Sequence, residues 1–326
     1  MPANLPPQYF AAEKNFREAK EPQEKIAALE EMIAVMPKHK GTDHLKAELR
    51  ARISKLSQEA GKRSGTTRIS MVIEREGAGQ VAIVGLPNCG KSQLVAAVTN
   101  ASPIVAAYPL TTHAATPGMM PFEDIQIQLI DTPPLVAQLL QWWLPPLLRR
   151  VDALIIMVDL SQETRSQVQS VAQALEKMRI ISGAGRGDMD SENSVWHKKA
   201  IIAGNKSDLD EGGRNYRALF EAYGQKYPII AISASEGRGI PEMKRLIYDT
   251  LGILRVYTKA PGQKADMTDP IVLPCGSTVA EAANSVHKDL GSHLKYARLW
   301  GSGKHEGMMV KRDHVLVDGD VIELHE

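Results

Sequence analysis

Residues 81–92 have the sequence VAIVGLPNCGKS, and the fold of the chain follows from this stretch. An apolar run, residues 81–84, leads into a segment that fits the pattern G-x-x-x-x-G-K-[ST]. The run predicts a buried strand and the residues after the pattern predict a helix, which is the context that this motif requires. Backbone N–H groups of such a turn, together with the positive end of the helix, face a polyphosphate. A tight turn without a ligand is the alternative, and the spacing disfavours it.

Short apolar runs alternate with amphipathic segments after this motif. We predict strands at 81–86, 125–131, 153–160, 199–205 and 227–233, and helices at 93–99, 164–180, 215–223 and 241–251. Such alternation is typical of an α/β fold with a mostly parallel sheet and helices on both faces. The residues at 182–193 are rich in Gly, Asp and Ser and predict a loop.

The alternation ends near residue 251. Beyond it we predict a strand at 271–273, a helix at 279–290 and a hairpin at 315–324 that turns on Asp318 and Gly319. Residues 9–61 predict two antiparallel amphipathic helices. We therefore expect a helical N-terminal region at 1–78, an α/β domain at 79–251 and a small α+β domain at 252–326.

The composition excludes several classes of protein. With 39 Lys and Arg against 38 Asp and Glu in 326 residues, the chain is not a uniformly basic nucleic-acid coat. Two cysteines do not make a disulfide framework, which fits a reducing compartment. No apolar run reaches the roughly 18 residues that a membrane span needs. We expect a cytoplasmic protein without a membrane partner.

The first motif supplies candidate ligands for phosphate and metal. We expect Lys91 to neutralise β- and γ-phosphate oxygens and the Ser92 hydroxyl to coordinate Mg²⁺. Asp131 ends the next predicted strand, where a carboxylate reaches Mg²⁺ through water. The candidate nucleotide-binding residues of the motif are Gly85, Pro87, Asn88, Cys89, Gly90, Lys91 and Ser92.

A second motif, NKSD at residues 205–208, ends a later predicted strand and fits N-K-x-D. The Asp208 carboxylate would accept hydrogen bonds from N1–H and the amino group of guanine. Adenine has an acceptor at N1, so a carboxylate there rejects it. A surface turn is the alternative for such a tetrapeptide, but its place behind a phosphate loop favours a base site. The further candidates are Asn205, Lys206, whose stem would pack along the ring, and Ser233, Ala234 and Ser235, which would support guanine through backbone N–H groups.

These motifs resemble a GTPase domain of the translation-factor class. The sequence YPLTT at residues 108–112 is similar to the YPFTT switch of the Obg–HflX superfamily. The resemblance implies that Thr112 contacts Mg²⁺ and the γ-phosphate, so Thr112 and Lys91 are the candidate catalytic residues. The segments RVYTKAPGQKADMTDPIVL, TVAEAANSVHKDL, YARLWG and DHVLVDGDVIEL resemble the TGS domain, a β-grasp fold, of DRG-type (developmentally regulated) GTP-binding proteins.

The resemblance covers about residues 79–326 and implies a function. It implies a protein that binds GTP and GDP with Mg²⁺, hydrolyses GTP, and acts as a switch on the ribosome or a structured RNA. The first 80 residues carry 14 Lys and Arg against 11 Asp and Glu, which is compatible with contacts to RNA phosphates. The adjacent Trp142 and Trp143 cannot both face one core from a helix, so this region is a candidate surface for a protein partner.

Three positions depart from the family pattern. Pro134 replaces the Gly whose N–H normally meets the γ-phosphate, and proline has no N–H. Leu135 stands where other GTPases carry a water-orienting Gln, so slow intrinsic hydrolysis is expected. Asn88 replaces the usual Ser and is a candidate K⁺ ligand; otherwise it is a residue that favours turns.

Two other functions remain open on the sequence. The departures at Pro134 and Leu135 are compatible with a nucleotide-dependent binding module whose hydrolysis is negligible. An ATPase resembling the YchF group is the second alternative, because that group shares the GLPN sequence of residues 85–88 and a TGS domain. Asp208 argues against an ATPase.

Overall fold

A computed structural model describes residues 28, 29, 32, 49, 52, 73–99, 115–136, 141, 143–183, 189–190, 195–302 and 305–325. The chain divides into two compact units, Met1–Met71 and Val72–Glu326. The described residues of the first unit are helical, with Ala28, Leu29, Met32 and Leu49 buried. The rest of the predicted helical pair at 9–61 lies outside the described residues.

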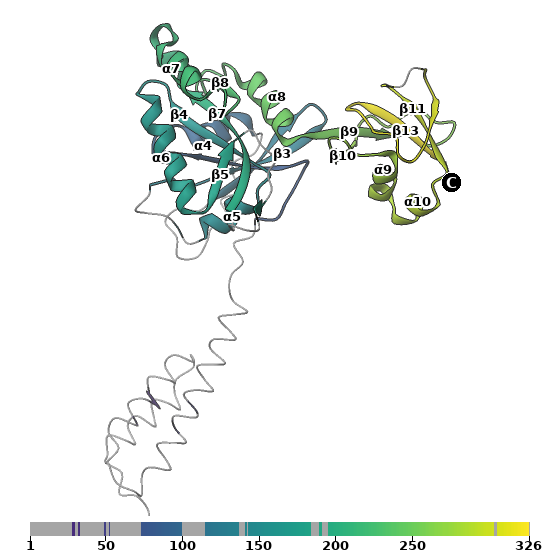
Figure 1. The fold of residues 1–326 in the computed structure, drawn as a ribbon, viewed down its shortest axis with the longest axis horizontal. Coiled ribbons are helices and arrows are strands. Elements are labelled where there is room, and N and C mark those ends of the chain that lie inside the picture. Colours follow the sequence, from purple (N-terminus) through teal and green to yellow (C-terminus); the bar gives the residue numbers. More distant parts are fainter. Residues whose placement is uncertain are drawn as a thin grey trace, which may run out of the picture. The chain divides into compact units, whose positions relative to one another are not determined.

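The second unit contains a mostly parallel sheet, as predicted (Figure 1). Its strands follow the order β2-β3-β1-β4-β7-β5, with β6 and β8 also paired to β7. The central strands are parallel, whereas β2 runs antiparallel to β3 at the edge. The bounds are β1 Gln80–Gly85, β2 Thr116–Phe122, β3 Ile125–Asp131, β4 Ala153–Asp159, β5 Ile180–Gly183, β6 Met189–Asp190, β7 Val195–Asn205 and β8 Ile229–Ala231.

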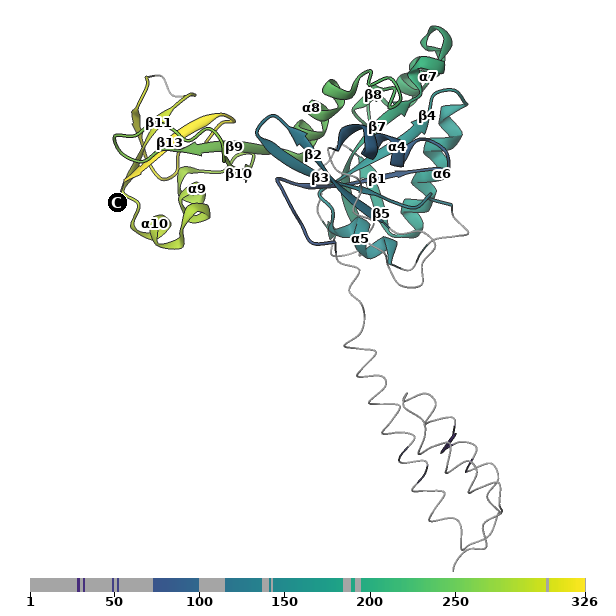
Figure 2. The same ribbon diagram turned by 180° about the vertical axis from the view of Figure 1, so that it is seen from behind.

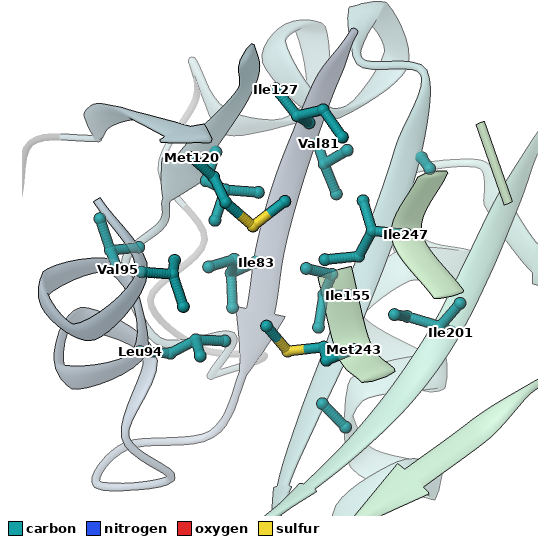
Figure 3. Close-up of a cluster of buried hydrophobic side chains, with 14 of the residues drawn as sticks. Val81, Ile83, Leu94, Val95, Met120, Ile127, Ile155, Ile201, Met243 and Ile247 are labelled. Carbon is teal, nitrogen blue, oxygen red and sulfur yellow. The ribbon is translucent and has the colours of Figure 1, made fainter. Parts of the chain in front are cut away.

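Helices cover both faces of this sheet. On one face, α4 and α8 contribute side chains such as Leu94, Met243 and Ile247 to the cluster around Ile83 and Ile155 (Figure 3). Helix α6 packs on β1, β4 and β5, and its buried side chains lie outside that cluster, so it covers the other face. The helices are α4 Lys91–Val98, α5 Leu144–Arg150, α6 Thr164–Lys177, α7 Arg214–Tyr223 and α8 Ile240–Leu251, with 3₁₀ turns η1 Ser207–Leu209 and η2 Glu211–Gly213. The predicted α/β class is confirmed.

Three local predictions for this sheet were wrong. The strand β2 was not predicted; it contains Pro117 and Pro121, which an edge strand tolerates. The loop predicted at 182–193 begins inside β5, which runs to Gly183, and the short β6 interrupts it. The helix predicted at 164–180 ends at Lys177, since the chain turns at Arg179 with φ of 58°.

A second, five-stranded sheet follows α8. Its order is β10-β9-β13-β11-β12, in which β13 is parallel to β9 and antiparallel to β11. Helix α9 packs Val279, Ala282 and Ala283 into the core of this sheet. The bounds are β9 Ile253–Thr258, β10 Ile271–Pro274, β11 Tyr296–Trp300, β12 Met308–Val310, β13 Asp320–His325, α9 Val279–Val286 and α10 Lys288–His293.

Two predictions for this segment were also wrong. The chain does turn at Asp318 and Gly319, but no hairpin forms, because both edges of β13 are taken by β9 and β11. Val315 instead forms an isolated bridge with Thr278. The helix predicted at 279–290 is divided at His287, whose backbone is extended, with φ of −159°.

Candidate nucleotide-binding site

The phosphate loop, residues 85–92, leaves the carboxyl end of β1 and enters α4. Asn88 and Gly90 have positive φ values of 63° and 98°. A Cβ at position 90 would lie 2.3 Å from the Asn205 Nδ2, so only glycine fits there. The first turn of α4 contains no acidic residue. Its free N–H groups and the helix dipole therefore favour an anion at this end.

Lys91 lies against the inner side of this loop. Its Nζ donates to the carbonyl oxygens of Leu86 at 3.0 Å and Gly85 at 3.3 Å, and it lies 3.8 Å from the Cys89 Sγ. The side chain is only 7% exposed. The positive charge is thus held where the loop and the start of α4 converge.

Ser92 and Asp131 form the part of the site that fits a divalent cation. The Ser92 Oγ donates to the Asp131 Oδ2, and the Asp131 Oδ1 is buried without a hydrogen-bond partner among the described residues. Burial raises the pKa of Asp131, although Ser92 and Lys91 oppose that shift. Hydroxyl and carboxylate oxygens are the ligands that Mg²⁺ prefers, and a bound cation would satisfy the orphaned oxygen. A cleft of about 300 Å³ lies here between the phosphate loop and residues 131–134.

Asn205 joins the phosphate loop to residues 233–235, the loop predicted to support the base, which we call the base loop. Its Nδ2 donates to the Cys89 carbonyl oxygen at 2.9 Å, and its Oδ1 accepts from the Ala234 N–H at 3.0 Å. The residue is 1% exposed. Asn205 therefore holds two loops together, rather than presenting its amide to a ligand.

Asp208 and Ser235 offer groups that a base could use. The Asp208 Oδ1 is buried, and no donor reaches it from the described part of the chain. The N–H groups of Ser233 and Ala234 donate to Arg238 and Asn205, whereas the described residues give no acceptor to that of Ser235. The structure thus brings the phosphate loop, Asp131, residues 205–208 and residues 233–235 together at the carboxyl ends of the parallel strands. Thr112 lies outside the described residues.

Asp159, at the end of β4, is a site residue that the sequence analysis missed. Its Oδ2 accepts from the Lys206 Nζ at 2.6 Å, and its Oδ1 accepts from the N–H and Oγ of Ser161. Burial would raise the pKa of Asp159, but the hydrogen bonds from Lys206 and Ser161 lower it below its ordinary value. Asp159 therefore fixes Lys206, which has a φ of 62°, beside the base loop. The sequence does mark Asp159, because it is an acidic residue at the carboxyl end of a buried apolar strand, as Asp131 is.

The segment after Asp131 is tied to β1. Thr132 Oγ1 donates to the Ile83 carbonyl oxygen at 2.7 Å, and the Leu135 N–H donates to that of Gly85 at 3.0 Å. The Leu135 side chain is 1% exposed. Pro134 has no N–H, so neither it nor Leu135 offers a free donor toward the cleft.

The tryptophan pair is only partly described. Trp143 precedes α5 and is 3% exposed, which places its side chain in the core. Trp142 lies outside the described residues, and the predicted partner surface there stays a prediction. No helix among the described residues is both long and apolar enough to cross a bilayer.

Comparison with known proteins agrees with this geometry. Residues 80–184 match the family of 50S ribosome-binding GTPases, and residues 254–326 match the TGS domain. The chain thus combines a segment that matches the GTPase family with a TGS domain. It is similar to developmentally-regulated GTP-binding protein 1 of Xenopus laevis, with 26% identity over 92% of this chain and 98% of that protein. The predicted DRG-like resemblance is confirmed.

One further curated protein and one solved structure match most of this chain. A GTP-binding protein of Methanocaldococcus jannaschii is 27% identical, over 93% of this chain and 92% of that protein. The structure of the Schizosaccharomyces pombe YchF GTPase has a TM-score of 0.48 and 13% identity, and the match covers 77% of this chain and 99% of that one.

Proposed function

We propose that this GTPase-family protein binds GTP with Mg²⁺ at the edge formed by the phosphate loop and residues 205–208, and hydrolyses it slowly to GDP and phosphate. One observation carries the proposal: the Asn205 amide bonds to both Cys89 and Ala234. These bonds hold a phosphate site and a guanine site in fixed register. The unpartnered Asp208 Oδ1 supports guanine as the base, because guanine supplies donors at that position.

Each group has a role in this proposal. Lys91 neutralises phosphate charge, Asp208 accepts from guanine, and the Ser235 N–H faces the base. Ser92 and Asp131 hold Mg²⁺, which supplies electrostatic stabilisation of phosphate oxygens when bound. Thr112 completes the metal site by resemblance to the family.

Slow hydrolysis follows from the segment after Asp131. Leu135 is buried and has no polar atom that could orient a water molecule, and its N–H is already bonded to Gly85. Pro134 cannot supply the N–H that would order this segment on the γ-phosphate. Catalysis above a slow basal rate then depends on another group, such as a K⁺ ion held by Asn88.

The same proposal divides the chain into three parts and gives it a partner. Residues 79–251 would form the switch, residues 252–326 the TGS domain, and residues 1–78 a basic helical region. The matched family description, a 50S ribosome-binding GTPase, supports a ribosome or structured RNA as the cytoplasmic partner. Co-sedimentation with ribosomes in the GTP, GDP and nucleotide-free states tests this; equal recovery in all three states would contradict a nucleotide-dependent switch.

Single-turnover GTP hydrolysis by the full chain tests the enzyme assignment. We expect phosphate release above the uncatalysed rate, and faster release in KCl than in NaCl. Asn88→Ala should remove the K⁺ stimulation while leaving GTP affinity unchanged, whereas Asn284→Ala, an exposed change on α9, should leave both unchanged. Stimulation that persists in Asn88→Ala would exclude Asn88 as the K⁺ ligand.

A nucleotide-dependent binding module without hydrolysis is the second candidate. The burial of Leu135 and its bond to Gly85 favour it. Tight GTP binding with no phosphate release in KCl, NaCl or with ribosomes would establish this module and refute the GTPase. A YchF-like ATPase would bind ATP more tightly than GTP, a result that the Asp208 carboxylate disfavours.

A further inference from the structure

The β2–β3 hairpin runs from the metal site to a turn next to the TGS domain. Thr116 pairs with Asp131 at one end of its ladder, and Phe122 pairs with Ile125 at the other. The ladder is continuous between these pairs (Figure 2). The carboxylate that fits Mg²⁺ therefore lies at one end of a regular hairpin, and the turn Glu123-Asp124 lies at the other.

Arg255, in strand β9 of the TGS domain, holds that turn. Its Nη1 donates to the Asp124 Oδ1 at 2.7 Å and also to the Glu123 carboxylate. On its other side, Nη2 donates to the Asp318 Oδ2 at 2.8 Å and Nε donates to Oδ1 at 3.1 Å. We call these four residues the Arg255 clasp. The Arg255 side chain is only 9% exposed, whereas that of Glu123 is 49% exposed, so the bonds to Asp124 and Asp318 are the better shielded ones.

Aromatic residues fix the clasp to both domains. Tyr248 of α8 donates to the Asp318 Oδ1 at 2.6 Å and stacks on Phe122, with 5.0 Å between ring centroids. The Arg255 guanidinium lies 5.3 Å from the centre of the Tyr248 ring. Tyr257 of β9 donates to the Asp124 carboxylate. Arg255 and Tyr257 of the TGS domain thus bind the turn, and Tyr248 of α8 packs on Phe122 beside it.

The turn needs such a partner. Glu123 has a φ of 50° in a two-residue hairpin turn, a position at which glycine or asparagine is usual. Three carboxylates surround Arg255, and among the described residues only Arg245, at 3.9 Å from Glu123, adds a second positive charge. Without the guanidinium, Glu123, Asp124 and Asp318 would repel one another, and the turn would lose the bonds that offset its backbone strain.

We propose that Arg255 is a positioning residue of the nucleotide site, through which the TGS domain controls the geometry of Asp131. This inference rests on the proposed binding of nucleotide with Mg²⁺. Asp131 pairs with Ile83 of β1 on one side and with Thr116 of β2 on the other. A hairpin that is fixed at its turn holds the second side in one arrangement, and a released hairpin lets that side vary. Because such coupling is reciprocal, a partner that displaces the TGS contacts loosens Mg²⁺ and nucleotide, and bound Mg²⁺ and nucleotide strengthen the clasp.

The test measures release of a fluorescent GDP analogue from the full chain at a series of Mg²⁺ concentrations. One variant is Arg255→Lys, which keeps the charge but cannot bridge Asp318 and the turn with a planar fork. The other is the double variant Glu123→Gln/Asp124→Asn, which leaves the Arg255–Asp318 pair intact. Glu221→Gln, exposed on α7, is the matched control.

Both clasp variants should release the analogue about fivefold faster or more, and should need correspondingly more Mg²⁺ for half-maximal retention. The control should match the wild type. A purely structural clasp would lower the melting temperature of the variants but leave the Mg²⁺ dependence unchanged, and that result in a folded variant overturns the inference. If Arg255→Lys does not fold, the double variant decides.

The proposed function fails in a different way. If the wild-type chain does not retain the analogue at any Mg²⁺ concentration, the nucleotide site itself is refuted and the coupling is refuted with it. If the wild type retains the analogue and the clasp variants behave like Glu221→Gln, only the positioning role of Arg255 is refuted.

Discussion

Replacing Asn205 by alanine should separate the phosphate loop from the base loop. The substitution removes two buried hydrogen bonds, to the Cys89 carbonyl and from the Ala234 N–H. Each orphaned buried partner costs about 1–3 kcal/mol, so the free energy of unfolding should fall by roughly 2–6 kcal/mol. The free energy of unfolding of an ordinary domain is about 5–15 kcal/mol, so the variant should still fold, with reduced stability.

The assay is urea unfolding in the absence of nucleotide, followed by calorimetric titration of GTP with Mg²⁺. Asn205→Asp provides a second comparison, because it keeps an acceptor for Ala234 but places a carboxylate oxygen against the Cys89 carbonyl oxygen. Since position 205 is only 1% exposed, the buried and repelled charge should lower the unfolding free energy at least as much as Asn205→Ala does. GTP affinity should fall in both variants, since their two loops are no longer held in register.

Asn284→Ala provides the control, because Asn284 is exposed on α9. Its unfolding free energy should stay within about 0.5 kcal/mol of the wild type. The reasoning is refuted if Asn205→Ala is as stable as this control and binds GTP with wild-type affinity. The amide of Asn205 would then have no part in joining the loops.

Three further predictions concern charge and reactivity. Asp208→Asn should weaken GTP binding about a hundredfold or more while leaving ATP binding unchanged in calorimetry, because hydrogen bonds to a charged acceptor are worth roughly 1.5–3 kcal/mol each; equal losses for both nucleotides would contradict guanine recognition. N-ethylmaleimide should label exposed Cys275 before buried Cys89, since burial raises the pKa of the Cys89 thiol despite Lys91. Peptide mapping over time measures the order, and labelling of Cys89 first would contradict the prediction. Burial alone would raise the pKa of Asp318, but hydrogen bonds from Arg255 and Tyr248 lower it from 3.8 to about 2. This depressed pKa stabilises the fold above about pH 4, and the contribution is lost toward pH 2. The gap in unfolding free energy between wild type and Asp318→Asn should therefore narrow on acidification in urea unfolding; a constant gap would count against it.

The local structure of the candidate site was predictable wherever its signal is local in sequence. The glycines and Lys91 of the phosphate loop must follow a strand and open a helix, and the 12 consecutive residues 81–92 do so; their ligand stays a prediction. The place of Asp208 just after a strand was predictable for the same reason. The position of Asp159 at the end of a buried run was also visible in the sequence, but its bond to Lys206 was not, because Lys206 is 47 positions away and only the fold brings the two together.

The errors in the fold have the same origin. Alternating polar and apolar residues around Asp318 correctly indicated extended chain, but alternation does not say which strand pairs with which. The neighbours of β13 come from β9 and β11, and the Asp318 carboxylate binds Arg255, which is 63 positions away. The Arg255 clasp likewise could not be predicted, since it joins three segments distant in sequence.

The prolines of β2 have a consequence for how this sheet meets other chains. The Ala78 N–H bonds to the Gln126 carbonyl and the Gln128 N–H bonds to that of Gly79, so alternate residues of β3 point their backbone groups away from β2. The β2 residues opposite them, among them Pro117 and Pro121, accordingly have backbone groups that point outward from the edge. Proline has no hydrogen to donate there. Of the outward-facing positions 117, 119 and 121, only Met119 keeps an N–H, so this border of the sheet resists strand addition and amyloid-like stacking.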